Sequence, residues 1–436
     1  MDEKSGGLAL YLSKTRQFSR NARLVLIYSA ITGLAFGVYR FLANFYILSL
    51  GYDEAFIGTL QTLSSLATIA MALPAAYLAE RFPQKRVMIV TALLSSLAVT
   101  GIVLIPGRVA LILFNMLAGV SMSTRQVAMA PFLMANTSEE DRQWVFSFNF
   151  GLMTTASFFG NLLGGLLPTW LGGPFGAMPT DTLAYQLAIG SMMLVTMLSI
   201  GPLSLIRMPP PEKGRQVALP WVQLWQHGRQ LARFLLPQLV IGLGAGLMQP
   251  FMNVYFRHVY NKPDPPIAWV FAIGGLAMAI AQFLGPVLAD RYGKIHTVIL
   301  TQLVSVPFLL MLALGAWLVP TGRGNAELWF AIAGLAYILR LALMNLSNPV
   351  YQTFVLEHVP KDTQALTMSL NSLSFQFGWF VMPQVSGWLQ VQYGNLGFVA
   401  IFLSVAGLYV TATVVEWWLF ARPGAMQRLQ EIQGQA

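Results

Sequence analysis

Long apolar stretches free of charged residues recur from Leu24 almost to the C-terminus of this chain. Each stretch is near or above the ~20 residues that an α-helix needs to cross ~30 Å of hydrocarbon. Membrane-spanning strands are shorter and would alternate polar and apolar residues with a period of two. Only 10% of the 436 residues are charged, against about 25% in soluble domains. The pattern therefore predicts an all-α polytopic membrane protein.

We expect twelve transmembrane helices in two pseudo-symmetric six-helix bundles. An N-terminal segment (1–23) precedes the first bundle (24–206), a linker (207–232) leads to the second bundle (233–420), and a tail (421–436) follows. The expected helices span residues 24–50, 55–79, 87–106, 109–135, 143–168, 183–206, 233–258, 267–289, 295–319, 327–356, 363–391 and 396–420. An even number of crossings places both termini on the same side of the membrane.

The basic residues are distributed unevenly between the two sides. Of the 26 Lys and Arg residues, 19 fall on the side of the termini and four on the other side. The positive-inside rule then predicts that both termini are cytoplasmic, in the plasma (inner) membrane. The net charge of +9 is explained by this topology and by contact with anionic membrane lipids, so no nucleic-acid partner is needed.

Several classes of protein lack support in the sequence. The absence of cysteine excludes disulfides and thiol catalysis, and no phosphate-binding loop of the G-x-x-x-x-G-K-[ST] type is present. A membrane enzyme should cluster His, Asp, Glu or Ser near one interface, and no such cluster is seen. We therefore expect no enzyme activity, no metal site and no cofactor. A non-transporting membrane scaffold or a membrane enzyme is the alternative from another functional class.

An internal repeat joins the two predicted bundles. The segment GLAFGVYRFLANFY at residues 33–46 returns as GLGAGLMQPFMNVY at residues 242–255, so that Asn44 and Tyr46 correspond to Asn253 and Tyr255. Further matches follow in order along the chain, up to Ser147 and Ser369. Their offsets rise steadily from 209 to 222, as small insertions would produce. Parallel halves with a site at their interface near the mid-membrane plane are a plan of transporters.

Two loops carry a related motif. Residues 288–294 (LADRYGK) follow the eighth expected helix, and residues 78–86 (LAERFPQKR) follow the second. With twelve spans and a central linker, this closely resembles the major facilitator superfamily, whose loop signature reads G-x-L-A-D-R-x-G-R-R. The resemblance covers about residues 20–422, although Pro83 replaces the second glycine in the first copy. It implies a gating role in these loops for Glu80, Arg81, Asp290, Arg291 and Gly293. Charged turns that only fix topology are the alternative.

Three arginines fall inside the expected spans and away from the span ends: Arg40, Arg125 and Arg340. An arginine at the bilayer centre costs at least ~2.5–3.5 kcal/mol, so it should face the bundle interior or a water-filled cavity. All three lie about ten to sixteen residues from the outer ends of their spans. Of the 17 acidic residues only Glu416 falls inside a span beyond its first residue, and it lies near the cytoplasmic end. Fixed positive charge without a central carboxylate favours an anion, which the arginine fork can bind through two hydrogen bonds.

We therefore predict a transporter that moves a small solute, an organic or phosphate-bearing anion, by alternating access. The resemblance places the first, fourth, seventh and tenth spans along the central cavity. The predicted substrate-binding residues are Arg40, Asn44, Arg125, Gln249 (the repeat partner of Arg40), Asn253 and Arg340. Further candidates for hydrogen bonds are Gln61, Gln126, Gln282, Asn345, Asn348 and Gln352, and candidates for the cavity walls are Tyr39, Tyr46, Tyr255 and Trp379. We expect a monomer.

Two alternatives stay open at this point. Each intramembrane arginine could be structural, Arg125 above all, and polar amides often join helices. Broad efflux of lipophilic compounds is favoured by 12% aromatic residues, 21 Met and a partial antiporter-like glycine pattern in the fifth span. The four histidines lie in loops or at span ends. The sequence therefore favours anion exchange, or coupling at a site that it does not identify.

Overall fold

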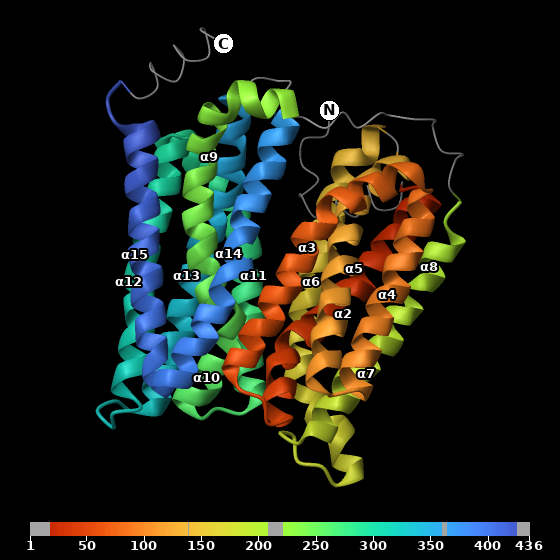
Figure 1. The fold of residues 1–436 in the computed structure, drawn as a ribbon, viewed down its shortest axis with the longest axis vertical. Coiled ribbons are helices and arrows are strands. Elements are labelled where there is room, and N and C mark those ends of the chain that lie inside the picture. The colour runs from red at the N-terminus through yellow and green to blue at the C-terminus, as the bar shows by residue number, and fades with distance from the viewer. Residues whose placement is uncertain (1–17, 138, 208–220, 360–363, 425–436) are drawn as a thin grey trace, which may run out of the picture.

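The computed structural model describes residues 18–137, 139–207, 221–359 and 364–424. This part of the chain is almost entirely helical (Figure 1). Its helices are α2 (Arg20–Ser49), α3 (Glu54–Arg81), α4 (Gln84–Leu104), α5 (Arg108–Ala135), α6 (Glu139–Gly172), η1 (Gly173–Phe175), α7 (Thr182–Leu198), α8 (Ile200–Leu205), α9 (Trp221–Met248), η2 (Gln249–Phe251), α10 (Met252–Tyr260), α11 (Asp264–Tyr292), α12 (Lys294–Leu318), α13 (Ala326–Glu357), α14 (Gln364–Tyr393), η3 (Gly394–Leu396), α15 (Gly397–Glu416) and η4 (Trp417–Ala421).

The helices match the expected membrane crossings. Ten stretches of the described chain are long and apolar enough to cross a membrane, and one of them contains both α14 and α15. The 28-residue α5 adds a further crossing. The all-α architecture with twelve crossing helices is therefore confirmed.

The seventh crossing differs from its repeat partner, the first. The helix α2 runs unbroken past Phe41, whereas the corresponding position of the second half is Pro250. Proline lacks an N–H and clashes with the preceding turn. The seventh crossing is therefore broken into α9, the short 3₁₀ segment η2 and α10.

The crossings form two groups, α2 to α8 and α9 to α15, which stand side by side in Figure 1. Within the first group α2 packs on α6 and α3 on α5, and within the second group α9 packs on α14 and α12 on α13. The two groups touch mainly where α3 meets α14 and where α6 meets α11.

The repeated residues make equivalent contacts in both groups. A Cβ atom at Gly33 would lie 2.7 Å from the carbonyl oxygen of Met153, and one at Gly242 would lie 2.4 Å from that of Phe375. Only glycine allows the backbones to approach so closely. The hydroxyl of Tyr46 donates to the carbonyl of Ile102 (3.1 Å), and that of Tyr255 donates to the carbonyl of Leu312 (2.9 Å). The repeat in the sequence is thus also a repeat in the packing.

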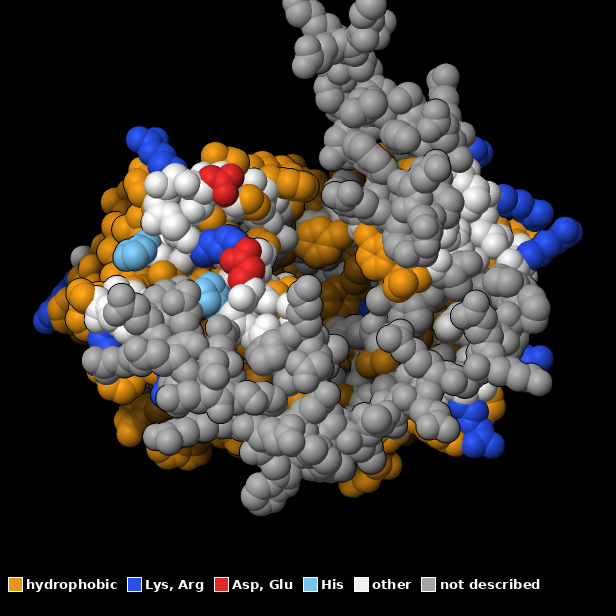
Figure 2. Space-filling view, turned by 90° about the horizontal axis from the view of Figure 1, so that it is seen from above, with side chains coloured by type: hydrophobic (Ala, Val, Ile, Leu, Met, Phe, Trp, Pro, Cys, Tyr) orange, Lys and Arg blue, Asp and Glu red, His pale blue; other side chains and the backbone are white. Residues whose placement is uncertain are grey.

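The two groups are joined at the end opposite the start of α2 and the end of α15. In the described chain, the hydrogen bonds and ion pairs between the groups involve only residues near that end, hereafter the outer end. At the other end, Figure 2 shows a recess between the groups that is lined with hydrophobic side chains. The structure is therefore closed at its outer end, with its central space lying toward the side of the termini.

Candidate functional site

A cavity of ≈ 380 Å³ lies between the two groups of helices. Its lining comes from α2, α3, α4 and α5 of the first group and from η2, α10, α11 and α14 of the second. Small-molecule sites usually have volumes of about 300–1,000 Å³. Both halves therefore contribute to one space large enough for a small solute.

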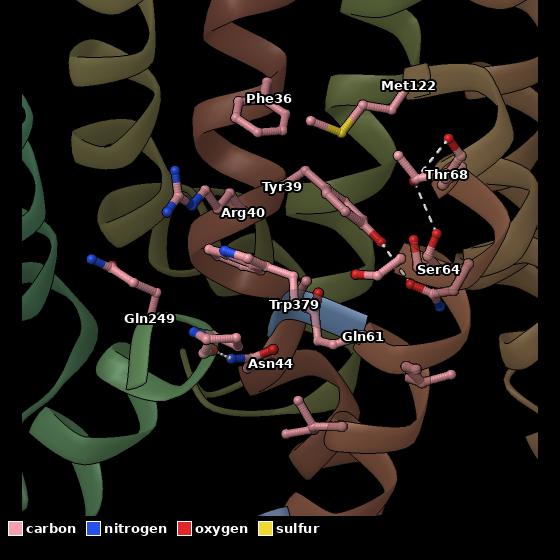
Figure 3. Close-up of a pocket in the computed structure, with 18 of the residues that line it drawn as sticks. Phe36, Tyr39, Arg40, Asn44, Gln61, Ser64, Thr68, Met122, Gln249 and Trp379 are labelled. Atoms are coloured by element: carbon pink, nitrogen blue, oxygen red, sulfur yellow. Dashed lines mark hydrogen bonds between the residues drawn. The ribbon is translucent and has the colours of Figure 1, made fainter. Parts of the chain in front are cut away.

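Arg40 supplies the positive charge in the described lining of this cavity. Among the described residues that line it, Arg40 alone is charged, and none is a carboxylate. The side chain is exposed, and no hydrogen bond or ion pair ties it to the part of the chain that the structure describes. Figure 3 shows Arg40 and Gln249 reaching toward the same side of the cavity, with Trp379 beside them. The repeat partners Arg40 and Gln249 thus line the same cavity.

Two donors near Arg40 add to its positive field. The indole Nε1–H of Trp379 is buried and has no acceptor among the described residues. The break at Pro250 places the N-terminal end of α10, which carries partial positive charge, beside the cavity. An acceptor bound at this position would meet donors from both halves of the protein.

Asn44 and Asn253 bond to each other across the boundary between the halves. The Nδ2 of Asn44 donates to Oδ1 of Asn253 (2.9 Å) and to the carbonyl of Pro250 (2.6 Å). The Nδ2 of Asn253 donates to the carbonyl of Phe41 (2.9 Å). Since Phe41 and Pro250 are themselves repeat partners, the arrangement is nearly symmetric. Both amides line the cavity, and their donors are used in closing its outer end.

Replacing Asn44 or Asn253 with alanine should weaken this closure by similar amounts, about 1–2 kcal/mol each. The double variant should lose less than the sum, because the two side chains share one bond. Spin labels at Thr180→Cys and Thr321→Cys, in outer loops of the two halves, would report the change as a larger population of long distances. A strongly unequal effect of the two substitutions would contradict the symmetric arrangement.

The other two arginines do not line the cavity in this conformation. Arg340 is 1% exposed and donates to the hydroxyl of Tyr409 on α15. Its Nε and Nη1 have no partner among the described residues. The hydroxyl of Tyr337 lies within electrostatic reach of both Arg340 and Arg40. Arg340 therefore lies behind the cavity wall, and its predicted contact with substrate stays a prediction.

Arg125 of α5 is not among the residues that line the cavity. Its side chain is half-buried, and it lies close enough to the Tyr28 hydroxyl to interact with it. This placement agrees with the structural alternative noted for Arg125, and direct substrate binding by this residue also stays a prediction.

An ion-pair cluster beyond the asparagines closes the outer end. Arg257 of α10 pairs with Asp264 of α11, and the Tyr185 hydroxyl of α7 accepts from Arg257 (2.8 Å) and donates to Asp264 (3.1 Å). The guanidinium carbon of Arg257 lies 3.6 Å from the ring centroid of Phe45, a cation–π contact. The second half thus presents an ion pair to two aromatic residues of the first half. We call Phe45, Tyr185, Arg257 and Asp264 the outer cluster.

A second contact flanks the outer cluster. The Nδ1 of His258 lies 3.2 Å from a carboxylate oxygen of Glu54, which begins α3 in the other half. In the sequence, Arg257 and His258 lie at the end of an expected span and Asp264 lies in a loop, so none of the three was singled out. The one available signal was an arginine and an acid on either side of the short turn 261–263, at which Asn261 adopts a left-handed φ of 50°.

The loop motifs lie at the end where the halves are apart. Arg81 donates to the Tyr77 hydroxyl of its own helix, and the side chain of Glu80 lies outside the described residues. Asp290 is exposed at the end of α11, Arg291 lies over the ring of Tyr292, and Gly293 turns the chain into α12 with a φ of +82°. Their predicted gating role remains a prediction.

The comparisons with known proteins agree with this architecture. The family model of the Major Facilitator Superfamily matches residues 25–383 and, in a second match, residues 234–434. No curated protein matches the chain.

Solved structures of transporters share the fold. The nucleoside transporter NupG has a TM-score of 0.76 at 14% identity, covering 92% of this chain and 99% of its own. A bacterial homologue of the iron transporter ferroportin in an inward-facing state has a TM-score of 0.71 at 14% identity, covering 92% of this chain and 99% of its own. A D-xylose–proton symporter has a TM-score of 0.66 at 15% identity, covering 93% of this chain and 97% of its own. The chain is a multi-pass membrane transporter rather than an enzyme, and it belongs to the Major Facilitator Superfamily.

Proposed function

We propose that this transporter moves a small organic or phosphate-bearing anion, which binds at Arg40 between the two halves. The observation that carries the proposal is the guanidinium of Arg40, which has no hydrogen-bond or ion-pair partner among the described residues. It faces a cavity whose described lining has no carboxylate. A positive charge that faces a low-dielectric cavity without a counter-ion attracts an anionic ligand. Carboxylate and phosphate match the two parallel donors of the guanidinium.

We propose further that the halves rock around this site to expose it alternately to each side of the membrane. The described conformation is closed at the outer end by Asn44, Asn253 and the outer cluster. With 19 of 26 basic residues on the side of the termini, the positive-inside rule supports cytoplasmic termini in the plasma membrane. The structure would then face the cytoplasm, and the loop motifs around Arg81 and Asp290 would meet when that side closes. We propose that the transporter works as a monomer.

Efflux of lipophilic compounds is the second candidate. Phe36, Phe271, Phe375, Trp379 and Met122 line the cavity and give it apolar walls. The structural neighbours named for nucleosides, D-xylose and iron share the fold at only 14–15% identity. The proposed substrate therefore rests on the chemistry of the cavity. The lone arginine favours the anion.

Ligand-induced thermal stabilisation of the purified protein tests the proposal. A panel of small carboxylates and phosphate esters would be compared with lipophilic cations of similar size. Arg40→Gln should weaken anion binding by about 10–100-fold, because a charge-assisted hydrogen bond contributes about 1.5–3 kcal/mol. Arg125→Gln and Arg340→Gln, measured beside it, show whether these two predicted binding residues also contribute to anion binding. Stabilisation by cations that is the same in the parent and in Arg40→Gln would reject the proposal and favour efflux.

A further inference from the structure

The cavity has two chemically different poles, and together they narrow the class of anion. One pole holds Arg40, Gln249 and the indole of Trp379. The other lies on α3 and α5, where Figure 3 shows Tyr39 pointing away from Arg40 toward Ser64 and Gln61. The inference drawn from these poles rests on the proposed function, since it takes the anionic group to bind at Arg40.

Four glutamines line the cavity without a hydrogen bond to any described residue: Gln61, Gln126, Gln249 and Gln376. Two other polar side chains of the lining, Thr68 and Asn115, are already occupied. Thr68 donates to the carbonyls of Ser64 and Gly119, and Asn115 donates to the carbonyl of Leu111 (2.8 Å). The glutamines are therefore the amides available to a ligand. Each can both donate and accept, which suits hydroxyl and amide groups.

The charge of the site sets a limit on the charge of the ligand. The described lining has one cation, whereas a phosphate monoester carries about −1.5 to −2 at pH 7. Such an ester would leave about one negative charge without a partner in a partly desolvated space, which is costly. A carboxylate carries one charge and would be neutralised by Arg40.

We propose that the substrate is a monocarboxylate whose body carries hydroxyl or amide groups. Its carboxylate binds Arg40 and accepts from Trp379 Nε1–H, which otherwise lacks an acceptor. Its body lies along Tyr39 and exchanges hydrogen bonds with Gln61, Gln126 and Gln376. A site that is built to bond hydroxyls rejects analogues that lack them, since its own polar groups are then left unpaired.

Three matched pairs of probes test this proposal by isothermal calorimetry: gluconate and hexanoate, quinate and cyclohexanecarboxylate, pyroglutamate and cyclopentanecarboxylate. Glucose 6-phosphate and glucose serve as the dianionic and the neutral comparison compounds. At least one polar acid should bind about tenfold more tightly than its hydrocarbon partner and than both glucose compounds. Gln61→Leu and Gln376→Leu should each reduce that preference several-fold and leave the hydrocarbon acid unchanged. Gln352→Leu, which replaces an exposed glutamine of α13 outside the cavity, should have no effect.

The outcomes separate this inference from the proposed function. If every hydrocarbon acid binds as well as its polar partner while Arg40→Gln still abolishes binding, the proposed polar body is wrong and the anion carrier stands. Tighter binding of glucose 6-phosphate would overturn the restriction to monocarboxylates in the same way. If no anion depends on Arg40, the proposed function itself fails.

Discussion

Replacing Asp264 with alanine is expected to open the outer end of the transporter. Asp264 is 4% exposed and pairs with Arg257, whose side chain is 18% exposed. Removing one partner of a buried ion pair usually costs about 3–5 kcal/mol, because the other charge is left without compensation. That charge can regain water only if α10 and α11 part from Phe45 and Tyr185. Even the lower value shifts the equilibrium between closed and open forms roughly 100-fold.

The absence of cysteine makes the shift directly measurable. A single Ser65→Cys in the cavity lining would be labelled with a membrane-impermeant maleimide from the outer side, and Asp264→Ala should raise the rate strongly. The double variant Arg257→Leu with Asp264→Leu should label more slowly than Asp264→Ala, since neither charge is orphaned. Glu327→Ala breaks the ion pair with Lys262 at a carboxylate that is 79% exposed and should change little. An unchanged rate for Asp264→Ala would mean that the outer cluster does not hold the end closed.

Replacing Gly378 with leucine is expected to prevent stable folding of the second half. A Cβ atom at Gly378 would lie 2.0 Å from the carbonyl carbon and oxygen of Gly242 and 2.3 Å from the nitrogen of Leu243. All three are backbone atoms, so α9 and α14 could accept a side chain only by moving apart. Overpacking typically costs 1–3 kcal/mol, and the expected loss here is about 3 kcal/mol or more.

Alanine substitutions provide matched controls for this effect. Gly378→Ala should already lower the melting temperature in detergent by several degrees. Gly275→Ala and Gly407→Ala lie within α11 and α15, where an added Cβ meets no atom within 4 Å, and they should melt at or above the parent temperature because alanine favours the helix. Equal melting temperatures for Gly378→Ala and Gly275→Ala would show that the close approach of α9 and α14 is not needed.

The sequence predicted the parts of the fold that depend on local pattern. Span length and hydropathy identified the crossing helices, and the repeat identified residues with equivalent contacts, such as Gly33 with Gly242 and Tyr46 with Tyr255. These predictions succeed because each half packs its corresponding helices together in the same way.

The site was predicted only in part, since depth in the membrane does not determine the direction of a side chain. Arg40 and Arg340 were placed at similar depth, yet Arg40 is exposed in the cavity and Arg340 is 1% exposed behind it. Successive residues of a helix turn by about 100°, and helices that are apolar all round give no periodicity that would identify their cavity face. The outer cluster was missed because Arg257 and Asp264 lie at helix ends, where charges usually mark topology.

The break in the seventh crossing separates the short helix α10 from the rest of that crossing. The nine-residue α10 carries Asn253, Arg257 and His258, each of which contacts the first half at the outer end. The three-residue η2 separates this helix from α9 and contributes Gln249 and Pro250 to the cavity. A ligand that binds Gln249 would therefore act on η2, which is directly connected to the helix α10 that makes the contacts closing the outer end. Because α2 has no such break, we expect opening of the outer end to begin in the second half. The short helix α10 should move first, before the second bundle rotates as a whole.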